Sequence, residues 1–289
     1  MNILITGSTG FIGSHLSRAI SCTHAIFRPT HAQLDLLDEA TVERYLKRHA
    51  IDVIVNAAVV GGAGRNFYKE GMLGDNLRMF YTLARCRKQV KRIIHIGSGA
   101  VYDKRFPIVS VSEDRFGEKI PADPYGFYKY VCSDYVDHTE GGMDIRVFGI
   151  FGEGEDYRFR FISNAICRYI YGLPITIKQN VVFDYLDVND FVKIVEYFLS
   201  HKPRYKAYNV GSGTKIDLRT IARKIITLRD GGGGRITVAK HGKGNEYTPS
   251  ISRLRHEFPG FRPTPIDESL ARLYAWYEKR KKTIRRNEI

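Results

Sequence analysis

The first half of the sequence alternates short apolar runs with longer amphipathic stretches. Apolar runs of four to six residues predict strands, and stretches with apolar residues three and four apart predict helices. The predicted strands are residues 2–6, 24–27, 52–56, 92–97 and 144–148, and the predicted helices are residues 11–20, 39–49, 73–88 and 124–138. Strands that alternate with helices at this spacing predict βαβ units, a parallel sheet and right-handed crossovers.

The alternation becomes weaker after about residue 150. Helices are predicted over residues 157–171, 190–200, 216–228 and 266–282, and strands over residues 184–188 and 207–210. The sequence has no repeat and no Pro/Ser-rich linker between its halves. We therefore predict an α/β fold in which a Rossmann-type, doubly wound parallel sheet is intertwined with a smaller C-terminal α/β substrate lobe. The sheet domain would be residues 1–150, with residues 181–200 returning to it, and the lobe residues 151–289.

Composition changes this picture mainly through charge. Of 289 residues, 43% are hydrophobic and 26% charged, which is typical of a globular protein and excludes disorder and collagen-like repeats. The net charge of +14 predicts an anionic partner, such as a nucleotide, a nucleic acid or a membrane surface. No apolar run is long enough for a membrane span, and no secretory signal pattern is visible. Because the cysteines are widely spaced, we expect a cytoplasmic protein with reduced thiols and no metal site: Cys22, Cys86, Cys132 and Cys167.

A glycine-rich turn joins the first predicted strand to the first predicted helix. Residues 7–13 read GSTGFIG, in which the glycines are three residues apart. Glycine lets the backbone turn tightly and approach a pyrophosphate, while the N–H groups at the helix start face the phosphates. A glycine-rich loop alone is weak evidence, but its position between a strand and a helix favours a dinucleotide site. The candidate residues are Gly7, Thr9, Gly10, Phe11, Ile12 and Gly13.

The end of the second predicted strand bears on which dinucleotide is bound. A carboxylate at this point would bond the ribose 2′-hydroxyl of NAD, but residues 27–31 contain no acid. Arg28 stands there instead and favours the 2′-phosphate of NADP, with NAD as the alternative. Arg28 as an ordinary solvated arginine is an equally simple interpretation. Asp35 is a candidate to contact the adenine amino group, or else a helix N-cap.

A tyrosine and a lysine lie four residues apart on the helix predicted over residues 124–138. Tyr125 and Lys129 therefore share one helix face, and Asp123 can cap the helix. A neighbouring ammonium favours the phenolate form of a tyrosine, which can then exchange a proton with a substrate oxygen. Ser98 ends the fourth predicted strand, where ligands bind in parallel α/β sheets. Each motif alone is commonly a surface or turn feature, but their combination in this order is much more specific.

Together these motifs resemble the extended short-chain dehydrogenases/reductases, the NAD-dependent epimerase/dehydratase family of nucleotide-sugar epimerases, dehydratases and reductases. The similar segments are residues 6–16, 55–58, 146–152, 183–190 and 208–213, which span most of the chain. The resemblance implies that Ser98, Tyr125 and Lys129 form a catalytic triad, and that Tyr125 and Lys129 also contact the cofactor. It adds to the cofactor site Leu36, Ala57, Ala58 and Phe148. It also implies a homodimer that pairs through residues 73–88 and 124–138.

Within the class, residues 34–38, 57–62 and 97–104 are most similar to the GDP-L-fucose synthase family, NADPH-dependent epimerases/reductases of a GDP-4-keto-6-deoxysugar. Those enzymes epimerise two carbons through a cysteine and a histidine, and the matching positions here are Ala100 and Arg160. Neither exchanges a carbon-bound proton readily near pH 7. We therefore expect NAD(P)H-dependent reduction of the 4-keto group of a nucleoside-diphosphate 4-keto-6-deoxysugar, with a GDP-sugar favoured, without 3,5-epimerisation.

Two of the substrate-site candidates differ from the residues usual in the class. Gly149 stands where the class has an asparagine, and Phe183 stands where it has an arginine. The candidates are Ser98, Gly99, Ala100, Gly149, Arg168 and Phe183. A nucleotide-sugar 4-epimerase with tightly bound NAD needs the same triad and is the first alternative. A non-enzymatic nucleotide-sensing or RNA-binding protein on a reductase fold is the second, and the net charge is its motive.

The basic end of the chain qualifies the argument from charge. The sequence has no RNP-like or KH-like motif, so no nucleic-acid partner is expected. Residues 278–289 contribute +4 of the +14, and we expect them to be a solvated helix end and tail.

Overall fold

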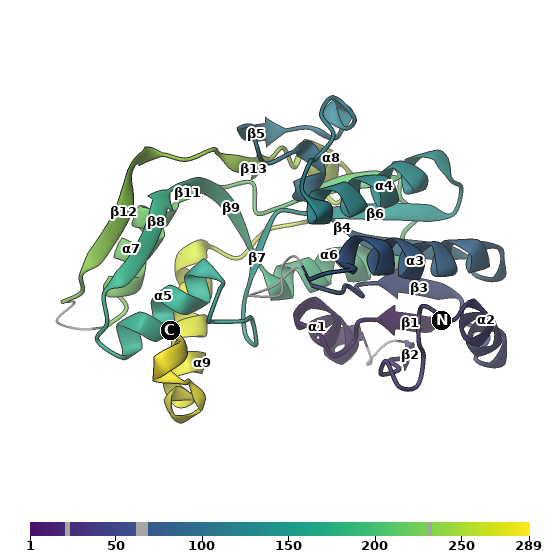
Figure 1. Cartoon of the computed structure of the whole chain (residues 1–289), viewed down its shortest axis with the longest axis horizontal. Helices are drawn as coiled ribbons and strands as arrows, with labels where there is room; N and C mark the ends of the chain where they lie inside the picture. The colour runs from purple at the N-terminus through teal and green to yellow at the C-terminus, as the bar shows by residue number, and fades with distance from the viewer. Residues whose placement is uncertain (21–23, 62–68, 230–232) are drawn as a thin grey trace.

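The structure is a computed structural model that describes residues 1–20, 24–61, 69–229 and 233–289. Two lobes lie side by side (Figure 1). The expected thiol at Cys22 and the last residue of the similar segment 57–62, Gly62, lie outside the described residues. The other three cysteines, Cys86, Cys132 and Cys167, are buried free thiols.

The first lobe is built on a six-stranded parallel sheet with the strand order β10-β6-β4-β3-β1-β2. Its strands are β1 (Asn2–Thr6), β2 (Ala25–Phe27), β3 (Val53–Asn56), β4 (Arg92–Ser98), β6 (Gly142–Val147) and β10 (Ala207–Val210). The order reverses between β1 and β3, which is the topological switch point at which such sheets bind ligands. The predicted doubly wound parallel sheet is therefore confirmed.

Helices cover both faces of this sheet (Figure 1). One face is covered by α1 (Phe11–Ala19) and α6 (Val188–Ser200), and the other by α2 (Glu39–Arg48), α3 (Met72–Arg85) and α4 (Pro124–His138). Alternate side chains of a strand point to opposite faces, so Ile3 and Ile5 join one core cluster while Leu4 joins the other. All three side chains are fully buried, which explains why the strand is apolar at successive positions.

The C-terminal lobe combines a second sheet with a helical layer. The sheet order is β11-β9-β13-β5, and β7 also pairs with β9. Its strands are β5 (Ile108–Val111), β7 (Gly149–Phe151), β9 (Val182–Asp187), β11 (Lys215–Asp217) and β13 (Tyr247–Pro249). A separate parallel pair consists of β8 (Ile175–Asn180) and β12 (Ile236–Lys243). The helices of this lobe are α5 (Phe161–Ile170), α7 (Leu218–Ile226) and α9 (Ile266–Lys279). Helix α8 (Ser252–Glu257) follows β13 but packs on β10 and the core of the first lobe.

The chain crosses between the lobes several times. Strand β5 comes from the first half of the sequence but pairs with β13, whereas α6 and β10 come from the second half and pack in the first lobe. Short 3-10 turns complete the structure: η3 (Cys86–Gln89), η4 (Gly99–Tyr102), η5 (Glu113–Arg115), η6 (Lys281–Thr283) and η7 (Arg286–Glu288). Among the described residues, no helix has both the length and the apolar character needed to cross a bilayer.

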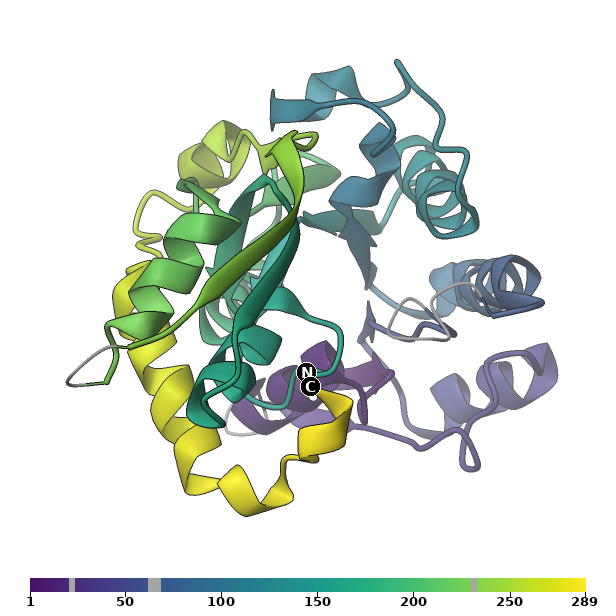
Figure 2. The same ribbon diagram turned by 60° about the vertical axis from the view of Figure 1, so that its left-hand side comes forward.

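The end of the chain differs from the expected solvated tail. Ile284 is only 6% exposed and belongs to the core cluster of the C-terminal lobe, against which Ile289 also packs. The Tyr171 hydroxyl donates to the Lys281 carbonyl, and the Arg285 N–H donates to the Tyr157 hydroxyl. Figure 2 shows this segment (yellow) folded back onto the lobe after α9. The basic side chains of this segment are exposed, as expected, but the expectation overlooked Ile284 and Ile289, which hold the backbone against the lobe.

Candidate active site

The glycine-rich turn after β1 has the geometry of an anion site. Gly7 has a positive φ of 65°, and its carbonyl accepts the Gly10 N–H at 3.0 Å. A Cβ on Gly7 would lie 2.6 Å from the Ala57 carbonyl oxygen, and one on Gly13 would overlap the Gly7 carbonyl. No side chain caps the start of α1, and its first turn contains no acid. The N–H groups of this helix start can therefore bind phosphate, and the turn fits a dinucleotide pyrophosphate.

Hydrogen bonds hold the strands on either side of this turn. The Thr6 hydroxyl donates to the Asn56 side-chain oxygen at 2.7 Å, and the Ala58 N–H donates to the Thr6 hydroxyl at 3.3 Å. These bonds fix the carboxyl ends of β1 and β3 relative to each other. Ala57 and Ala58 thus lie beside the turn, Ala57 in contact range of Gly7. The structure therefore brings these two predicted residues to the candidate cofactor site.

The predicted adenosine-side residues are arranged around the end of β2. Arg28 follows β2 directly and is exposed, and the adjacent Pro29 carbonyl accepts the Ser8 hydroxyl at 3.5 Å. The Asp35 carboxylate accepts the Leu37 N–H at 2.9 Å. Helix α2 is instead capped by Asp38, so the alternative of Asp35 as the N-cap was wrong. Leu36 is buried in the core between the sheet and helices α2 and α3, and its contact with a cofactor stays a prediction.

The three residues predicted to form a triad come from β4 and α4. Ser98 is the last residue of β4, and the Asp123 carboxylate accepts the Gly126 N–H at 2.9 Å to begin α4. The buried Lys129 ammonium donates to the Ile96 carbonyl at 2.5 Å. This bond anchors α4 to β4 two residues before Ser98. The predicted start of the helix at residue 124 is confirmed, and the spacing of Tyr125 and Lys129 places both near the end of β4.

Ser98 meets side chains from three parts of the chain. Its hydroxyl oxygen accepts the Ala100 N–H at 3.2 Å, and the Tyr247 hydroxyl from β13 lies beside the neighbouring Gly99. The Lys104 ammonium lies 5.7 Å from the centroid of the Tyr125 ring and 5.9 Å from that of Tyr247. A serine, two phenols and an ammonium therefore converge at the carboxyl end of β4.

Aromatic side chains form one wall of this site. The rings of Phe148 and Tyr247 have centroids 4.8 Å apart, and those of Phe183 and Tyr247 are 5.9 Å apart. A Cβ on Gly99 would lie 2.7 Å from both the Phe148 ring and the Tyr247 hydroxyl. Only glycine therefore fits at residue 99. Of the predicted residues, the structure brings Phe148, Gly99 and Phe183 together beside Ser98, while Ala100 is fully buried.

Two of the predicted substrate residues, Gly149 and Arg168, contact other parts of the protein and not the group around Ser98. Gly149 lies in β7, where a Cβ would overlap the Asp184 carbonyl of β9, so glycine here permits close strand pairing. The Arg168 guanidinium donates to the Pro174 carbonyl at 2.5 Å, at the C-terminal end of α5. The N-terminal end of α5 carries Arg160, whose charge acts on the phenol of Tyr247. Substrate contacts by Gly149 and Arg168 stay predictions.

Burial raises the pKa of two groups in the C-terminal lobe, Tyr247 and Glu155. Burial raises the pKa of Tyr247 well above its ordinary value, so this phenol stays protonated. Burial also raises the pKa of Glu155 to about 8, although a hydrogen bond from Ser163 and the charge of Arg160 oppose the shift. Among the described residues, no group of three or more His, Cys, Asp or Glu side chains is placed to hold a metal ion.

Sequence reasoning missed two features of the site. Asp184 is 1% exposed and accepts the Ser212 hydroxyl at 2.7 Å and the Gly213 N–H at 2.7 Å, so it holds the turn after β10. The similar segments over residues 183–190 and 208–213 contain both partners and could have suggested this contact. Tyr247 carried no such signal, because nothing in its local sequence relates it to Ser98.

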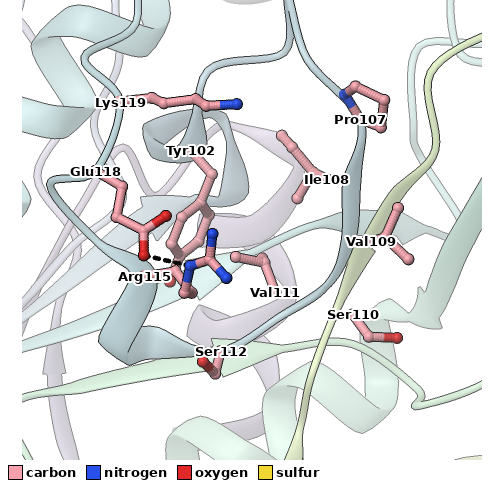
Figure 3. A pocket seen from close by; sticks show the side chains of 10 residues that line it. All are labelled: Tyr102, Pro107, Ile108, Val109, Ser110, Val111, Ser112, Arg115, Glu118 and Lys119. Atoms are coloured by element: carbon pink, nitrogen blue, oxygen red, sulfur yellow. Dashed lines mark ion pairs between the residues drawn. The ribbon is translucent and has the colours of Figure 1, made fainter.

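A separate cavity of about 260 Å³ opens beside Tyr102 (Figure 3). It is lined by residues 107–112 and by side chains of the following turn, in which Arg115 pairs with Glu118. None of the predicted site residues lines this cavity.

Known proteins share this sequence pattern and fold. The model of the NAD dependent epimerase/dehydratase family matches residues 3–211. ADP-L-glycero-D-manno-heptose-6-epimerase of Cupriavidus pinatubonensis is 25% identical over 267 residues, covering 79% of this chain and 78% of that protein. GDP-L-fucose synthase 1 of Arabidopsis thaliana is 23% identical over 248 residues, covering 77% and 76%. The crystal structure of a GDP-L-fucose synthetase from Naegleria fowleri bound to NADP has a TM-score of 0.83 at 16% identity and covers 99% of this chain and 95% of that one.

The matched residues include the phosphate turn, Ser98, Tyr125 and Lys129. The family uses NAD or NADP, and the relatives that match over most of the chain act on nucleotide sugars. These findings set aside the non-enzymatic alternative. The chain therefore belongs to the NAD dependent epimerase/dehydratase family, as an NAD(P)-dependent oxidoreductase or epimerase of nucleotide sugars.

Proposed function

We propose that the protein reduces the 4-keto group of a nucleoside-diphosphate 4-keto-6-deoxysugar, with a GDP-sugar favoured, and does not epimerise C3 or C5. The observation that carries this proposal is the convergence of Ser98, Tyr125 and Lys129 at the carboxyl edge of the sheet. The positions that resemble the epimerising pair are Ala100, which is fully buried, and Arg160, which is cationic. Neither offers a group suited to exchange a proton on carbon near pH 7.

The chain's own residues manage the proton of this reaction. When bound, the nicotinamide cofactor supplies the hydride that reduces C4. The Tyr125 hydroxyl donates a proton to the oxygen of C4, and the Ser98 hydroxyl hydrogen-bonds the same oxygen as it gains charge. Lys129 stabilises the phenolate that remains on Tyr125, and its bond to the Ile96 carbonyl holds it in place. The sugar is thereby oriented against the aromatic wall of Phe148 and Phe183.

We propose NADPH as the preferred cofactor. The end of β2 presents Arg28, which is exposed, at the position where an acid would favour NAD. An exposed guanidinium suits the 2′-phosphate of NADP, with which it can form two parallel hydrogen bonds. The phosphate turn itself accepts either dinucleotide, so Arg28 carries this preference alone.

A turnover assay tests both parts of the proposal. The purified protein is offered a panel of nucleoside-diphosphate 4-keto-6-deoxysugars with NADPH or NADH, and loss of reduced nicotinamide is followed. We expect turnover of at least one GDP-sugar with faster rates on NADPH. Tyr125→Phe should lower turnover by about 10²-fold or more while NADPH still binds. Tyr130→Phe is the control, because this tyrosine is on the same helix but stacks on Phe116. Wild-type turnover by Tyr125→Phe would refute the assignment.

The fate of C3 and C5 separates this reaction from its alternatives. In deuterated water, a reductase that does not epimerise leaves C3 and C5 of the product without deuterium, whereas deuterium at either carbon would show epimerisation. A 4-epimerase would instead interconvert nucleotide sugars without added cofactor and release stoichiometric NAD on denaturation. That alternative uses the same triad, so the released nucleotide decides between them.

We also propose that the protein is a homodimer. Helices α3 and α4 pack against each other on one face of the sheet, and each exposes an aromatic side chain, Tyr81 at 38% and Phe127 at 37%. Paired with the same helices of a second copy, these side chains would lose contact with water. Light scattering should give twice the chain mass, and a monomer would contradict the proposal.

A further inference from the structure

We propose that Lys104 binds the C3 hydroxyl of the sugar and makes the protein selective for ketosugars that keep this hydroxyl. The inference rests on the proposed function, because it takes the oxygen of C4 to lie at Tyr125 and Ser98. Lys104 belongs neither to the predicted triad nor to the predicted substrate contacts, so its role narrows the class of substrate in a new way.

Lys104 lies in a strained turn that follows η4. The turn begins at Asp103, which is 1% exposed and has a positive φ of 63°, a conformation that residues with a side chain rarely adopt. The Arg105 guanidinium holds Asp103 there, because its Nε and Nη2 donate to the carboxylate at 3.0 Å and 2.7 Å. The Asn245 side chain donates to the Arg105 carbonyl at 2.9 Å. Such strain persists only where the surroundings impose it, and it is typical of functional positions.

This turn places the Lys104 side chain at the reacting end of the site. Its ammonium lies 5.7 Å from the centroid of the Tyr125 ring and 5.9 Å from that of the Tyr247 ring. Tyr125 is on α4 of the first lobe and Tyr247 is on β13 of the second, so the ammonium lies where the two lobes meet. Lys104 is exposed, and its flexible stem can bring the ammonium to a bound sugar.

The position of Lys104 selects one polar group of the sugar. The diphosphate is attached at C1, which lies across the ring from C4 and therefore away from Tyr125. Of the two carbons next to C4 in a 4-keto-6-deoxysugar, C5 carries a methyl group and the ring oxygen, whereas C3 carries a hydroxyl. An ammonium has three protons to donate and no lone pair. It is therefore suited to donate to the oxygen of the C3 hydroxyl while Tyr125 and Ser98 engage the oxygen of C4.

Loss of the ammonium should weaken binding of the sugar without slowing the chemical step. The C3 hydroxyl does not change during reduction at C4, so its bond to Lys104 is equally strong before and during the reaction. We expect Lys104→Met to raise the KM for the ketosugar by about 10-fold, while kcat and the KM for NADPH change by less than about 2-fold. Methionine is also unbranched and residue 104 is exposed, so the variant should fold. A fall in kcat with an unchanged KM would place Lys104 in the proton transfer and overturn the proposal.

A second substrate tests whether Lys104 recognises the C3 hydroxyl. We compare kcat/KM for the ketosugar of the panel that is turned over fastest with kcat/KM for its counterpart that lacks the C3 hydroxyl. The wild type should prefer the hydroxylated sugar by about 10-fold or more, and Lys104→Met should lose most of this preference. Lys119→Met is the matched control and should keep it, because the Lys119 ammonium lies 3.7 Å from the centroid of the Phe106 ring and its side chain lines the separate cavity beside Tyr102 (Figure 3).

The outcomes separate this inference from the proposed function. If the wild type turned over no ketosugar of the panel, the proposed function would fail, and this inference with it. If the wild type turned over the ketosugar and Lys104→Met kept both its KM and its preference for the C3 hydroxyl, the proposed function would stand and only the role of Lys104 would be refuted.

Discussion

Glu155 shows how burial alone changes the chemistry of one side chain. It is 6% exposed, accepts a hydrogen bond from Ser163, and has a pKa raised to about 8 from an ordinary value of 4.5. Between these two values the folded protein binds more protons than the unfolded chain. The free energy of unfolding therefore falls as pH rises from about 4.5 to about 8, by up to about 1.4 kcal/mol per pH unit from this group.

Replacing Glu155 with glutamine should remove this contribution. Glutamine stays uncharged and can still accept from Ser163, so Glu155→Gln should lose less stability than the wild type between about pH 5 and pH 8. Urea unfolding across this range measures the difference in slope. Parallel curves for the two proteins would mean that Glu155 ionises normally in the folded state.

At the scale of elements, the sequence predicted correctly those strands and helices whose signals lie within their own residues. Strand β1 and helix α4 have the predicted bounds, because each has its own apolar periodicity and turn or cap residues. Strands β5 and β13 were not predicted, since each is three or four residues long and exists through pairing with the other, 139 residues away in the register Ile108–Tyr247. The same contrast holds in the candidate site. Tyr125 and Lys129 were found from their spacing in the sequence, whereas Tyr247 comes near Ser98 only through tertiary packing.

Helix α5 shows a different limit. Its predicted start was residue 157, but the structure begins it at Phe161. The N–H groups of Phe159 and Arg160 both donate to the Asp156 carbonyl and form a separate turn before the helix. Aromatic residues in that turn continue the apolar pattern of the helix, so periodicity alone could not place the boundary.

A substitution at Gly10, in the turn between β1 and α1, tests whether this turn binds the cofactor pyrophosphate. Gly10 has an ordinary negative φ, and a Cβ there would meet only the Gly7 carbonyl, at 3.3 Å. Gly10→Ala should therefore fold, with stability within about 1 kcal/mol of the wild type, but weaken NADPH binding by about 10-fold or more by adding bulk where the pyrophosphate approaches. Fluorescence titration measures this affinity. Gly74→Ala is the control, because no atom lies within 4 Å of its Cβ position. Unchanged affinity in Gly10→Ala would place the pyrophosphate elsewhere.

At the scale of the whole molecule, the surplus of positive charge divides into two parts. One part suits the phosphates of NADP and of a nucleotide sugar. The other includes the basic residues after α9, which are part of a packed segment because Ile284 and Ile289 hold it to the core of the C-terminal lobe. The Tyr171 hydroxyl reinforces this contact at the Lys281 and Ile284 carbonyls. Fixed in this way, the basic residues belong to the folded surface, with their side chains exposed.

The packing of this segment leads to a prediction about overall stability. Ile284→Ala removes a side chain that is 6% exposed and leaves a cavity in the lobe, so it should lower the free energy of unfolding by about 2–4 kcal/mol. Arg286→Ala alters the same segment at an exposed residue and should change it by less than about 0.5 kcal/mol. Thermal unfolding should therefore separate the two variants by roughly 5–10 °C. Equal unfolding temperatures would mean that charge, and not Ile284, determines where the end of the chain lies.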